Sequence, residues 1–225
     1  LTNQEISKKV DTSDEWIKSR TGISQRRISG LSENVSEMGY KAALGAIEMA
    51  KWDIETIDLI ILATSTPNDL FGSAPEIQSK LGAINAVAFD LTAACSGFLF
   101  AAITATQFLK AGSYKRAVVI GSDQLSSYVD WNDRSTCILF GDGAGAIAIE
   151  ATNEFDNLIG FSMRTDGQRG SFLNLPSQNN QDLIIDDINF SSGGFSSIEM
   201  NGQEVYKFAV REVPLIIDNL FKKTN

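Results

Sequence analysis

The sequence predicts an α/β fold with a largely parallel sheet, because short apolar runs alternate with segments of helical spacing. The clearest apolar run is residues 58–63, in which every position after the first is apolar. A run of this kind is typical of a strand that is buried on both faces of its sheet. Further short strands are expected at residues 86–89, 116–121 and 145–149.

Helical signals fill the segments between these runs. Residues 3–20 are expected to form two short helices, with Ser13 as the N-cap of the second. Residues 36–50 repeat apolar or small side chains at helical spacing. Ser73 followed by Pro75 predicts the start of another helix, with serine as the cap and proline in the first turn.

Residues 91–109 contain no charged side chain. Their length approaches the roughly 20 residues that cross a bilayer. The polar side chains within them and the strand directly before them argue against a membrane span, so no membrane partner is expected. We interpret the segment as a helix that protein covers on every side, and Gly112 is expected to end it.

The amino-acid composition of the chain changes near residue 151, after which Asn, Ser, Gly and Asp are frequent. We therefore expect one half at residues 1–150 and the start of a second, incomplete half at residues 151–225. The first residue is not Met, no signal peptide pattern follows it, and the last residues close a helical pattern. On these grounds the chain is expected to be a fragment.

Few elements are expected in the second half. Short strands are predicted at Leu158–Met163 and Leu183–Ile188. A final helix is predicted from about Asn201 to Phe221. Pro214 lies inside that helix and is expected to kink or divide it.

Composition excludes several classes of function. The 225 residues are 43% hydrophobic and 21% charged, as in ordinary globular proteins. The net charge of −9 disfavours binding to nucleic acid, so no such partner is expected. Two cysteines and no histidine exclude a structural zinc site and argue against a disulfide framework, which suits a reducing cytoplasm. Any cysteine–histidine catalysis would need a histidine from elsewhere.

Cys95 is the strongest candidate for chemistry. It lies in a small-residue turn between a predicted strand and the charge-free helix. The positive end of a helix dipole favours a thiolate at such a position, and exposed backbone N–H groups can stabilise an oxyanion. This arrangement resembles a nucleophile elbow. The alternative is a small buried cysteine that only packs.

Two other motifs favour structural interpretations. Cys137 lies in a short apolar run without a helix start, which predicts core packing. The glycine cluster Gly141–Gly145 leads into a strand rather than a helix, and no Walker lysine follows it. A tight turn is therefore preferred to a phosphate-binding loop, although such a turn can line a pocket.

Trp16, Arg20, Arg26 and Arg27 form a local basic and aromatic group, whereas the chain as a whole is acidic. Such a group could hold the phosphates of a nucleotide-containing ligand while the indole stacks on its base. The alternative is an amphipathic surface helix whose arginines are solvated.

Several strings together resemble one family, the β-ketoacyl-acyl carrier protein synthase III enzymes. They keep the family's order and near-family spacing across almost the whole chain. The strings are Asp11–Ile17, Arg20–Ile23, Phe89–Gly97, Gly121–Asp123, Asp133–Arg134, Phe140–Gly145 and, more weakly, Gly202–Lys207. The resemblance implies a thiolase-like αβαβα sandwich, of which this chain carries the N-terminal half and the start of the C-terminal half.

The resemblance also implies a reaction, the initiating condensation of type II fatty acid synthesis. Cys95 would take an acyl group from acyl-coenzyme A, with acetyl-coenzyme A as the expected primer. Malonyl-acyl carrier protein would then lose carbon dioxide, and its carbanion would attack the thioester to give 3-oxoacyl-acyl carrier protein. Coenzyme A is a substrate here, so neither a resident cofactor nor a metal is expected.

Further site residues follow from the same resemblance, and a homodimer is expected because one of them reaches the partner subunit's pocket. The coenzyme A-binding residues would be Thr12, Trp16, Arg20 and Arg134. The acyl pocket would be shaped by Leu125, Phe140 and Leu173, with Phe71 reaching toward the partner. Gly202 and Tyr206 are expected to line the pocket as well.

One departure from the family is serious. The family's triad is Cys-His-Asn, and its histidine, its asparagine and a second oxyanion glycine are expected beyond residue 225. The chain alone is therefore expected to be inactive. Two alternatives remain: a related thiolase-superfamily enzyme, such as an acyltransferase of secondary metabolism or a hydroxymethylglutaryl-type synthase, and a non-catalytic acyl-thioester binding protein.

Overall fold

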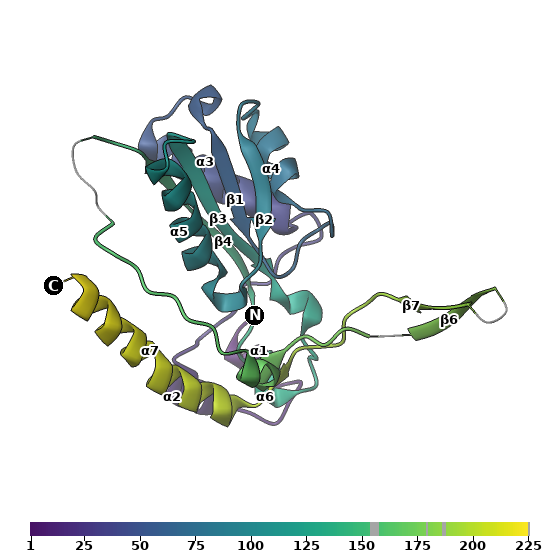
Figure 1. Ribbon diagram of the computed structural model, residues 1–225. Coiled ribbons are helices and arrows are strands. Elements are labelled where there is room, and N and C mark those ends of the chain that lie inside the picture. Colours follow the sequence, from purple (N-terminus) through teal and green to yellow (C-terminus); the bar gives the residue numbers. More distant parts are fainter. Residues whose placement is uncertain (154–157, 179, 186–187, 225) are drawn as a thin grey trace. The chain divides into compact units, whose positions relative to one another are not determined.

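The computed structural model describes residues 1–153, 158–178, 180–185 and 188–224 (Figure 1). The chain forms two compact units. The terminal unit comprises Leu1–Arg26, Leu125–Phe140 and Ser162–Asn225, and the sheet unit comprises Arg27–Gln124 and Gly141–Phe161. The halves predicted from the sequence, residues 1–150 and 151–225, are two similar α/β halves of a thiolase-like fold and not compact units of this kind. They stay a prediction.

The sheet unit is built on a four-stranded sheet in the order β2-β1-β3-β4. Its strands are β1 Leu59–Ala63, β2 Val87–Leu91, β3 Arg116–Gln124 and β4 Asp142–Glu150. β1 pairs in parallel with both β2 and β3, and β4 pairs antiparallel with β3. The predicted α/β class and largely parallel sheet are confirmed.

Helices cover both faces of this sheet (Figure 1). The helices α3 Val35–Ala50 and α4 Ala74–Leu81 pack on one face, and α5 Gly97–Lys110 packs on the other. A short 3-10 helix, η1 Ile54–Thr56, precedes β1. Each predicted helix of this unit is therefore present.

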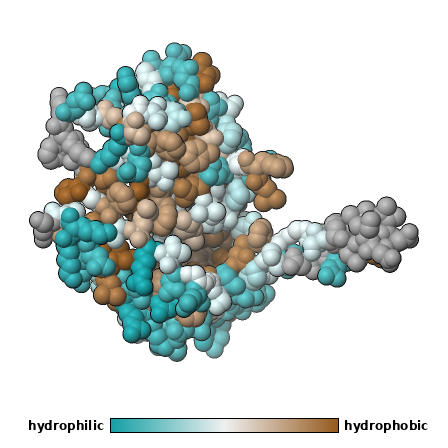
Figure 2. Space-filling view, in the orientation of Figure 1, coloured by the Kyte–Doolittle hydropathy of each residue, from teal (hydrophilic) through white to brown (hydrophobic). Residues whose placement is uncertain are grey.

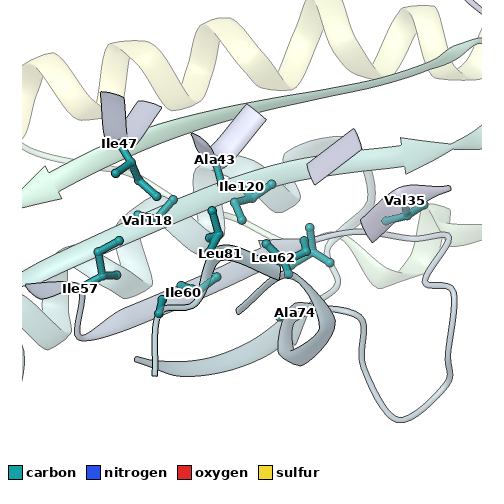
Figure 3. Packing of buried hydrophobic residues seen from close by; sticks show 12 residues of the cluster. Val35, Ala43, Ile47, Ile57, Ile60, Leu62, Ala74, Leu81, Val118 and Ile120 are labelled. Carbon is teal, nitrogen blue, oxygen red and sulfur yellow. The ribbon is translucent and has the colours of Figure 1, made fainter. Parts of the chain in front are cut away.

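β1 is buried on both faces, as its apolar run predicts. Ile60 and Leu62 join the cluster under α3 and α4, which Figure 3 shows from close by. Leu59 and Ile61 join the cluster under α5. Successive side chains of a strand point to opposite faces, so one strand supplies both clusters.

Two glycines allow close packing, one between α3 and α4 and the other between β3 and α5. A Cβ atom on Gly39 of α3 would lie 2.8 Å from Cδ1 of Ile77, which is too near for a real contact. A Cβ atom on Gly121 of β3 would lie 3.2 Å from the ring of Phe98. The glycine at each position thus leaves room for a side chain from a packed helix.

The charge-free helix α5 is covered on one face only by the described residues. Its buried residues recur at every fourth position: Gly97, Ala101, Ala105 and Leu109. Leu99, on another face, is 65% exposed. The prediction that protein covers this helix on every side is therefore wrong for this chain. Gly112, with φ of 77°, follows the helix end as predicted.

No helix in the described part of the chain is long and apolar enough to cross a membrane.

The glycine cluster Gly141–Gly145 does not form the predicted tight turn. Most of it belongs to β4, where Gly143 pairs with Asp123 and Gly145 pairs with Gly121. None of its glycines has a positive φ. The strand therefore begins earlier than the apolar run at residues 145–149 suggested, because ladder pairing with β3 needs no apolar side chain.

The terminal unit consists mainly of short elements. Its helices are α1 Asn3–Ile6, α2 Asp14–Thr21, η3 Leu125–Tyr128, α6 Arg134–Cys137 and η4 Gly167–Phe172. β5 Leu173–Asn174 pairs antiparallel with β8 Glu199–Met200. The two predicted N-terminal helices are confirmed, and Ser13 caps the second by accepting from Trp16 N at 3.1 Å.

Both predicted strands of the second half need correction. Leu158–Met163 forms no strand. The segment Leu183–Ile188 spans the end of β6 Asn180–Ile185 and the start of β7 Ile188–Ser192, which pair as an antiparallel hairpin. Residues 186–187 lie outside the described part.

The final helix, α7, runs from Gly202 to Thr224 without a division at Pro214. Asn201 precedes it and caps it by accepting from Glu204 N at 3.3 Å. The expected division at Pro214 is wrong, whereas a kink there stays a prediction, because the ring nitrogen cannot donate to the preceding turn.

Candidate functional site

Cys95 lies in a 3-10 turn, η2 Ala94–Ser96, between the end of β2 and the start of α5. Its side chain is exposed, whereas Cys137 is buried. A Cβ atom on Gly97 would lie 3.4 Å from Cβ of Ala63, so the first turn of α5 sits against the end of β1. The predicted order of strand, small-residue turn and helix is therefore present, with an accessible thiol in the turn.

The backbone next to the thiol is strained. Ala94 has φ of 46°, in the left-handed region that residues with a Cβ avoid. This conformation costs an L-residue about 1–2 kcal/mol, and it persists only where the surroundings impose it. Sharp turns with such strain are typical of nucleophile elbows.

Asp90, at the end of β2, connects the cysteine turn to a second loop. Its carboxylate accepts from Ser73 N at 2.8 Å and from Ala74 N at 2.7 Å. It thereby satisfies the first N–H groups of α4. Ser73 occupies the predicted cap position, but its Oγ accepts from Asn68 N at 2.8 Å and makes no cap hydrogen bond.

Phe71 lies in this second loop and is 99% exposed. The next residue, Gly72, has φ of 113°, which only glycine adopts without strain. The loop is thus anchored by Asp90 on one side and presents an aromatic ring to solvent. That Phe71 enters a partner's pocket stays a prediction.

Asp123 accepts several hydrogen bonds, a role that the local sequence pattern does not indicate. Its Oδ1 accepts from Thr64 Oγ1, Ser65 N and Thr66 Oγ1 at 3.2, 2.7 and 3.2 Å. These residues follow β1, so the bonds fix the chain beyond the carboxyl end of that strand. The string Gly121–Asp123 was the available signal, because it belongs to the family resemblance.

In the terminal unit, two guanidinium groups lie over one indole ring. Cζ of Arg20 lies 5.1 Å from the ring centroid of Trp16, and Cζ of Arg134 lies 5.2 Å from it. Arg134 also donates to the carbonyl oxygen of Asp11 at 2.8 Å. Three of the predicted coenzyme A-binding residues therefore lie together, and two positive charges accompany the aromatic face.

Thr12, the fourth predicted coenzyme A-binding residue, has a buried hydroxyl oxygen. Among the described residues that oxygen has no hydrogen-bond partner. A buried polar atom without a partner costs free energy, so a ligand that offers one is favoured there.

Arg26 does not belong to the exposed basic group. It is 4% exposed and donates from Nε to the carbonyl oxygen of Ile138 at 2.7 Å. Its Nη2 donates to the same oxygen, and its Nη1 donates to Asn3 Oδ1. Arg27, its neighbour, is exposed and belongs to the sheet unit. Of the predicted basic and aromatic group, only Trp16 and Arg20 lie together in the terminal unit. Arg134 lies beside them.

The predicted acyl-pocket residues of the terminal unit share one apolar cluster. Leu125, Phe140 and Leu173 are partly buried against a core that also receives Trp16. That core consists of Ile6, Ile17, Val129, Cys137, Ile138 and Ile198. Cys137 is 1% exposed, and burial raises the pKa of its thiol. It packs in the core, as the sequence predicts.

Gly202 and Tyr206 lie in the first turns of α7, and Tyr206 is 69% exposed. Both belong to the terminal unit, whereas Cys95 and Phe71 belong to the sheet unit. The structure thus brings together Trp16, the arginines and the apolar residues of the terminal unit within that unit. In the described part of the chain, no group of three or more His, Cys, Asp or Glu side chains could hold a metal ion.

Comparison with known proteins identifies related sequences. Residues 89–167 match the family model of 3-oxoacyl-[acyl-carrier-protein (ACP)] synthase III. The β-ketoacyl-[acyl-carrier-protein] synthase III of Prochlorococcus marinus subsp. pastoris (strain CCMP1986 / NIES-2087 / MED4) is 96% identical over 225 residues. The match covers 100% of this chain and 67% of that relative, so the chain spans about two thirds of the relative's length.

Figure 2 shows apolar surface on the one face of the molecule that it displays. Solved structures are similar to this chain as well. A crystal structure of 3-oxoacyl-[acyl-carrier-protein] synthase III from Aquifex aeolicus VF5 matches with a TM-score of 0.88 and 40% identity, over 100% of this chain and 67% of that one. β-Ketoacyl-[acyl carrier protein] synthase III from Thermus thermophilus matches with a TM-score of 0.81 and 34% identity, over 94% and 64% of the two chains. The fold is therefore that of these enzymes.

Proposed function

Because this chain belongs to the β-ketoacyl-acyl carrier protein synthase III family of acyl-transferring condensing enzymes, we propose that it carries the nucleophile and the coenzyme A-binding residues of such an enzyme. The observation that carries the proposal is the exposed thiol of Cys95 in a strained turn between a buried strand and a helix. The enzyme starts fatty acid synthesis in the cytoplasm by priming with an acyl group.

Cys95 performs the first half-reaction. Its thiol gives up its proton, and the thiolate attacks the carbonyl carbon of acyl-coenzyme A. A thioester forms on Sγ, and the coenzyme A thiolate leaves and takes up a proton in turn. Acetyl-coenzyme A is the proposed primer. The turn and the first residues of α5 supply backbone N–H groups for the developing oxyanion.

The second half-reaction joins two carbons to the acyl group. Malonyl-acyl carrier protein loses carbon dioxide, and the resulting carbanion attacks the thioester carbonyl. The product is 3-oxoacyl-acyl carrier protein, and Sγ of Cys95 is released. Negative charge develops on the malonyl thioester oxygen, which needs hydrogen-bond donors.

This chain contains no histidine. We therefore propose that the family's histidine and asparagine come from the third of the relatives' length that the chain does not cover. Losing even one oxyanion donor typically costs about 2.7–4 kcal/mol in an enzyme. Residues 1–225 alone are accordingly expected not to condense, while slow acylation of Cys95 can persist.

Coenzyme A is proposed to bind at the terminal unit. Adenine would stack at Trp16, where Arg134 lies over the ring, and phosphate would meet Arg20. Thr12 offers its unpartnered hydroxyl. Leu125, Phe140 and Leu173 would line the acyl group's path, and Gly202 and Tyr206 would contribute from α7.

A homodimer is also part of the proposal. Within the described residues β2 lies at one edge of the sheet, and Val87 in it is 49% exposed. An unpaired strand edge favours pairing with another strand. We place a second copy of the chain there, with Phe71 reaching across to it. Light scattering of the protein and of a Val87→Lys variant tests this placement, since the lysine should shift the mass toward the monomer.

The proposed nucleophile is tested by acyl transfer to the full-length enzyme, meaning this chain extended to the length of its relatives. Incubation with acetyl-coenzyme A should add one acetyl group, which peptide mass spectrometry should locate on Cys95. Cys137→Ser should still become acetylated, whereas Cys95→Ser should not. Acetylation of Cys95→Ser at the normal rate would remove the basis of the proposal.

A further inference from the structure

Arg26 is a buried cation held by neutral groups. Its guanidinium donates twice to the carbonyl oxygen of Ile138 and once to Asn3 Oδ1. Among the residues that the structure describes, no carboxylate pairs with it. A buried charge in this environment is costly to maintain, so it depends on these hydrogen bonds and their geometry.

The hydrogen bonds continue from Arg26 to the helix that carries Trp16. Asn3 is fully buried and donates from Nδ2 to Asp14 Oδ1 and to the carbonyl oxygen of Ile23, both at 2.8 Å. Asp14 is the first residue of α2, and its Oδ2 accepts from Lys18 Nζ at 2.8 Å. The chain of bonds therefore reaches the start of α2.

The other end of the network is the end of α6. Ile138 directly follows this four-residue helix, whose first residue is Arg134. Arg26 therefore connects the helix of Trp16 with the helix of Arg134. The cation–π contact between those two side chains bridges the same two helices.

We propose that Arg26 is a positioning residue that fixes the separation of Trp16 and Arg134, and thereby sets the affinity of the enzyme for the adenine end of coenzyme A. The inference rests on the proposed coenzyme A site. Arg26 acts through α2 and α6 and touches no substrate. Its own charge is turned inward, toward Ile138 and Asn3.

Arginine is needed at this position because of its shape. A guanidinium presents a rigid fork of donors, so Nε and Nη2 can share one carbonyl oxygen while Nη1 reaches Asn3. A lysine ammonium keeps the charge but places its donors around a single nitrogen. Arg26→Lys therefore removes the connection while it keeps the charge.

The test compares two acyl donors in the full-length enzyme. Acetyl-coenzyme A carries adenosine, whereas acetyl-pantetheine has the same thioester without it. The readout is the ratio of kcat/KM for acetyl-coenzyme A to kcat/KM for acetyl-pantetheine. Arg26→Lys should lower this ratio about 10- to 100-fold, because small misplacements of binding groups have effects of this size. The loss should fall on KM, with kcat unchanged.

Two further variants test whether a change in the ratio comes from the network. Asp14→Ala breaks the network at its partly exposed end and leaves Arg26 in place, so it should lower the ratio in the same direction even if Arg26→Lys folds poorly. Arg211→Lys makes the same substitution at an exposed arginine of the terminal unit and should leave the ratio unchanged. An unchanged ratio in Asp14→Ala, or an equal loss with both donors in folded Arg26→Lys, overturns the positioning role.

Trp16→Ala separates this inference from the proposed function. If Trp16→Ala leaves the ratio unchanged, the coenzyme A site itself is wrong. If Trp16→Ala lowers the ratio while Arg26→Lys and Asp14→Ala do not, the site stands and only the positioning role fails.

Discussion

The guanidinium of Arg134 lies over the indole ring of Trp16, with Cζ 5.2 Å from the ring centroid. A cation–π contact of this kind contributes roughly 0.5–1 kcal/mol at an exposed site. The same pair of side chains is the proposed clamp for adenine.

Replacement of Trp16 by alanine is expected to weaken coenzyme A binding by about 1–3 kcal/mol, the usual range for a lost stacking partner of a base. Isothermal titration calorimetry with coenzyme A measures the change in Kd. Trp52→Ala is a matched control, because Trp52 makes the same kind of contact with Arg116 at 5.1 Å in the sheet unit. Equal losses in the two variants would contradict the assignment.

Limited alkylation is expected to distinguish the two cysteines. Cys95 is exposed, whereas Cys137 is buried and burial raises the pKa of its thiol, so less thiolate is present there. A substoichiometric amount of iodoacetamide at pH 8 should therefore label Cys95, and Cys137 should react only in urea. Peptide mass spectrometry reads out the site. Faster labelling of Cys137 in the folded protein is the contrary outcome.

Asp90→Ala is expected to destabilise the protein by about 1–2 kcal/mol, because it leaves the N–H groups of Ser73 and Ala74 without their acceptor. Urea unfolding followed by circular dichroism measures the change. Asp69→Ala serves as the control in the same loop, since the Asp69 carboxylate accepts from the exposed N–H of Phe71 at 2.8 Å. A larger loss for Asp69→Ala than for Asp90→Ala would show that the loop is held differently.

Acid is expected to weaken the network at the start of α2. Hydrogen bonds from Lys18 and Asn3 lower the pKa of Asp14 below its ordinary value of 3.8. A carboxyl group with a lowered pKa contributes stability that is present above its unfolded pKa and is lost as the pH falls through its folded pKa. The contribution should therefore persist at pH 5 and disappear below pH 3.8.

The measurement for this prediction is the free energy of unfolding in urea across that range. Asp14→Asn cannot titrate, so its stability should fall less with acid than that of the unaltered chain. Parallel pH profiles of the two proteins would show that Asp14 contributes nothing.

The sequence alone determined the elements that depend on local pattern. The apolar run at residues 58–63 predicted a strand buried on both faces, and β1 is that strand. Gly112 predicted a helix end, because only glycine enters the left-handed region without strain. Cys95 could be singled out because a turn of small residues between strand and helix is a local feature. The family strings added the residues that surround it.

The tertiary structure decided which side chains are available. Arg26 and Arg27 are identical neighbours in sequence, yet only Arg26 is buried, because Ile138 and Asn3 surround it. Asp90, and not Ser73, accepts from the first N–H groups of α4, because folding brings the end of β2 beside the start of that helix.

Strand pairing and helix coverage were likewise beyond the sequence. The glycines of Gly141–Gly145 became part of a strand because β3 lies beside them. Leu99 of the charge-free helix stayed exposed because none of the described residues covers it. Local pattern fixes which conformation a segment prefers, whereas burial and hydrogen-bond partners come from residues that are distant in the chain and adjacent only after folding.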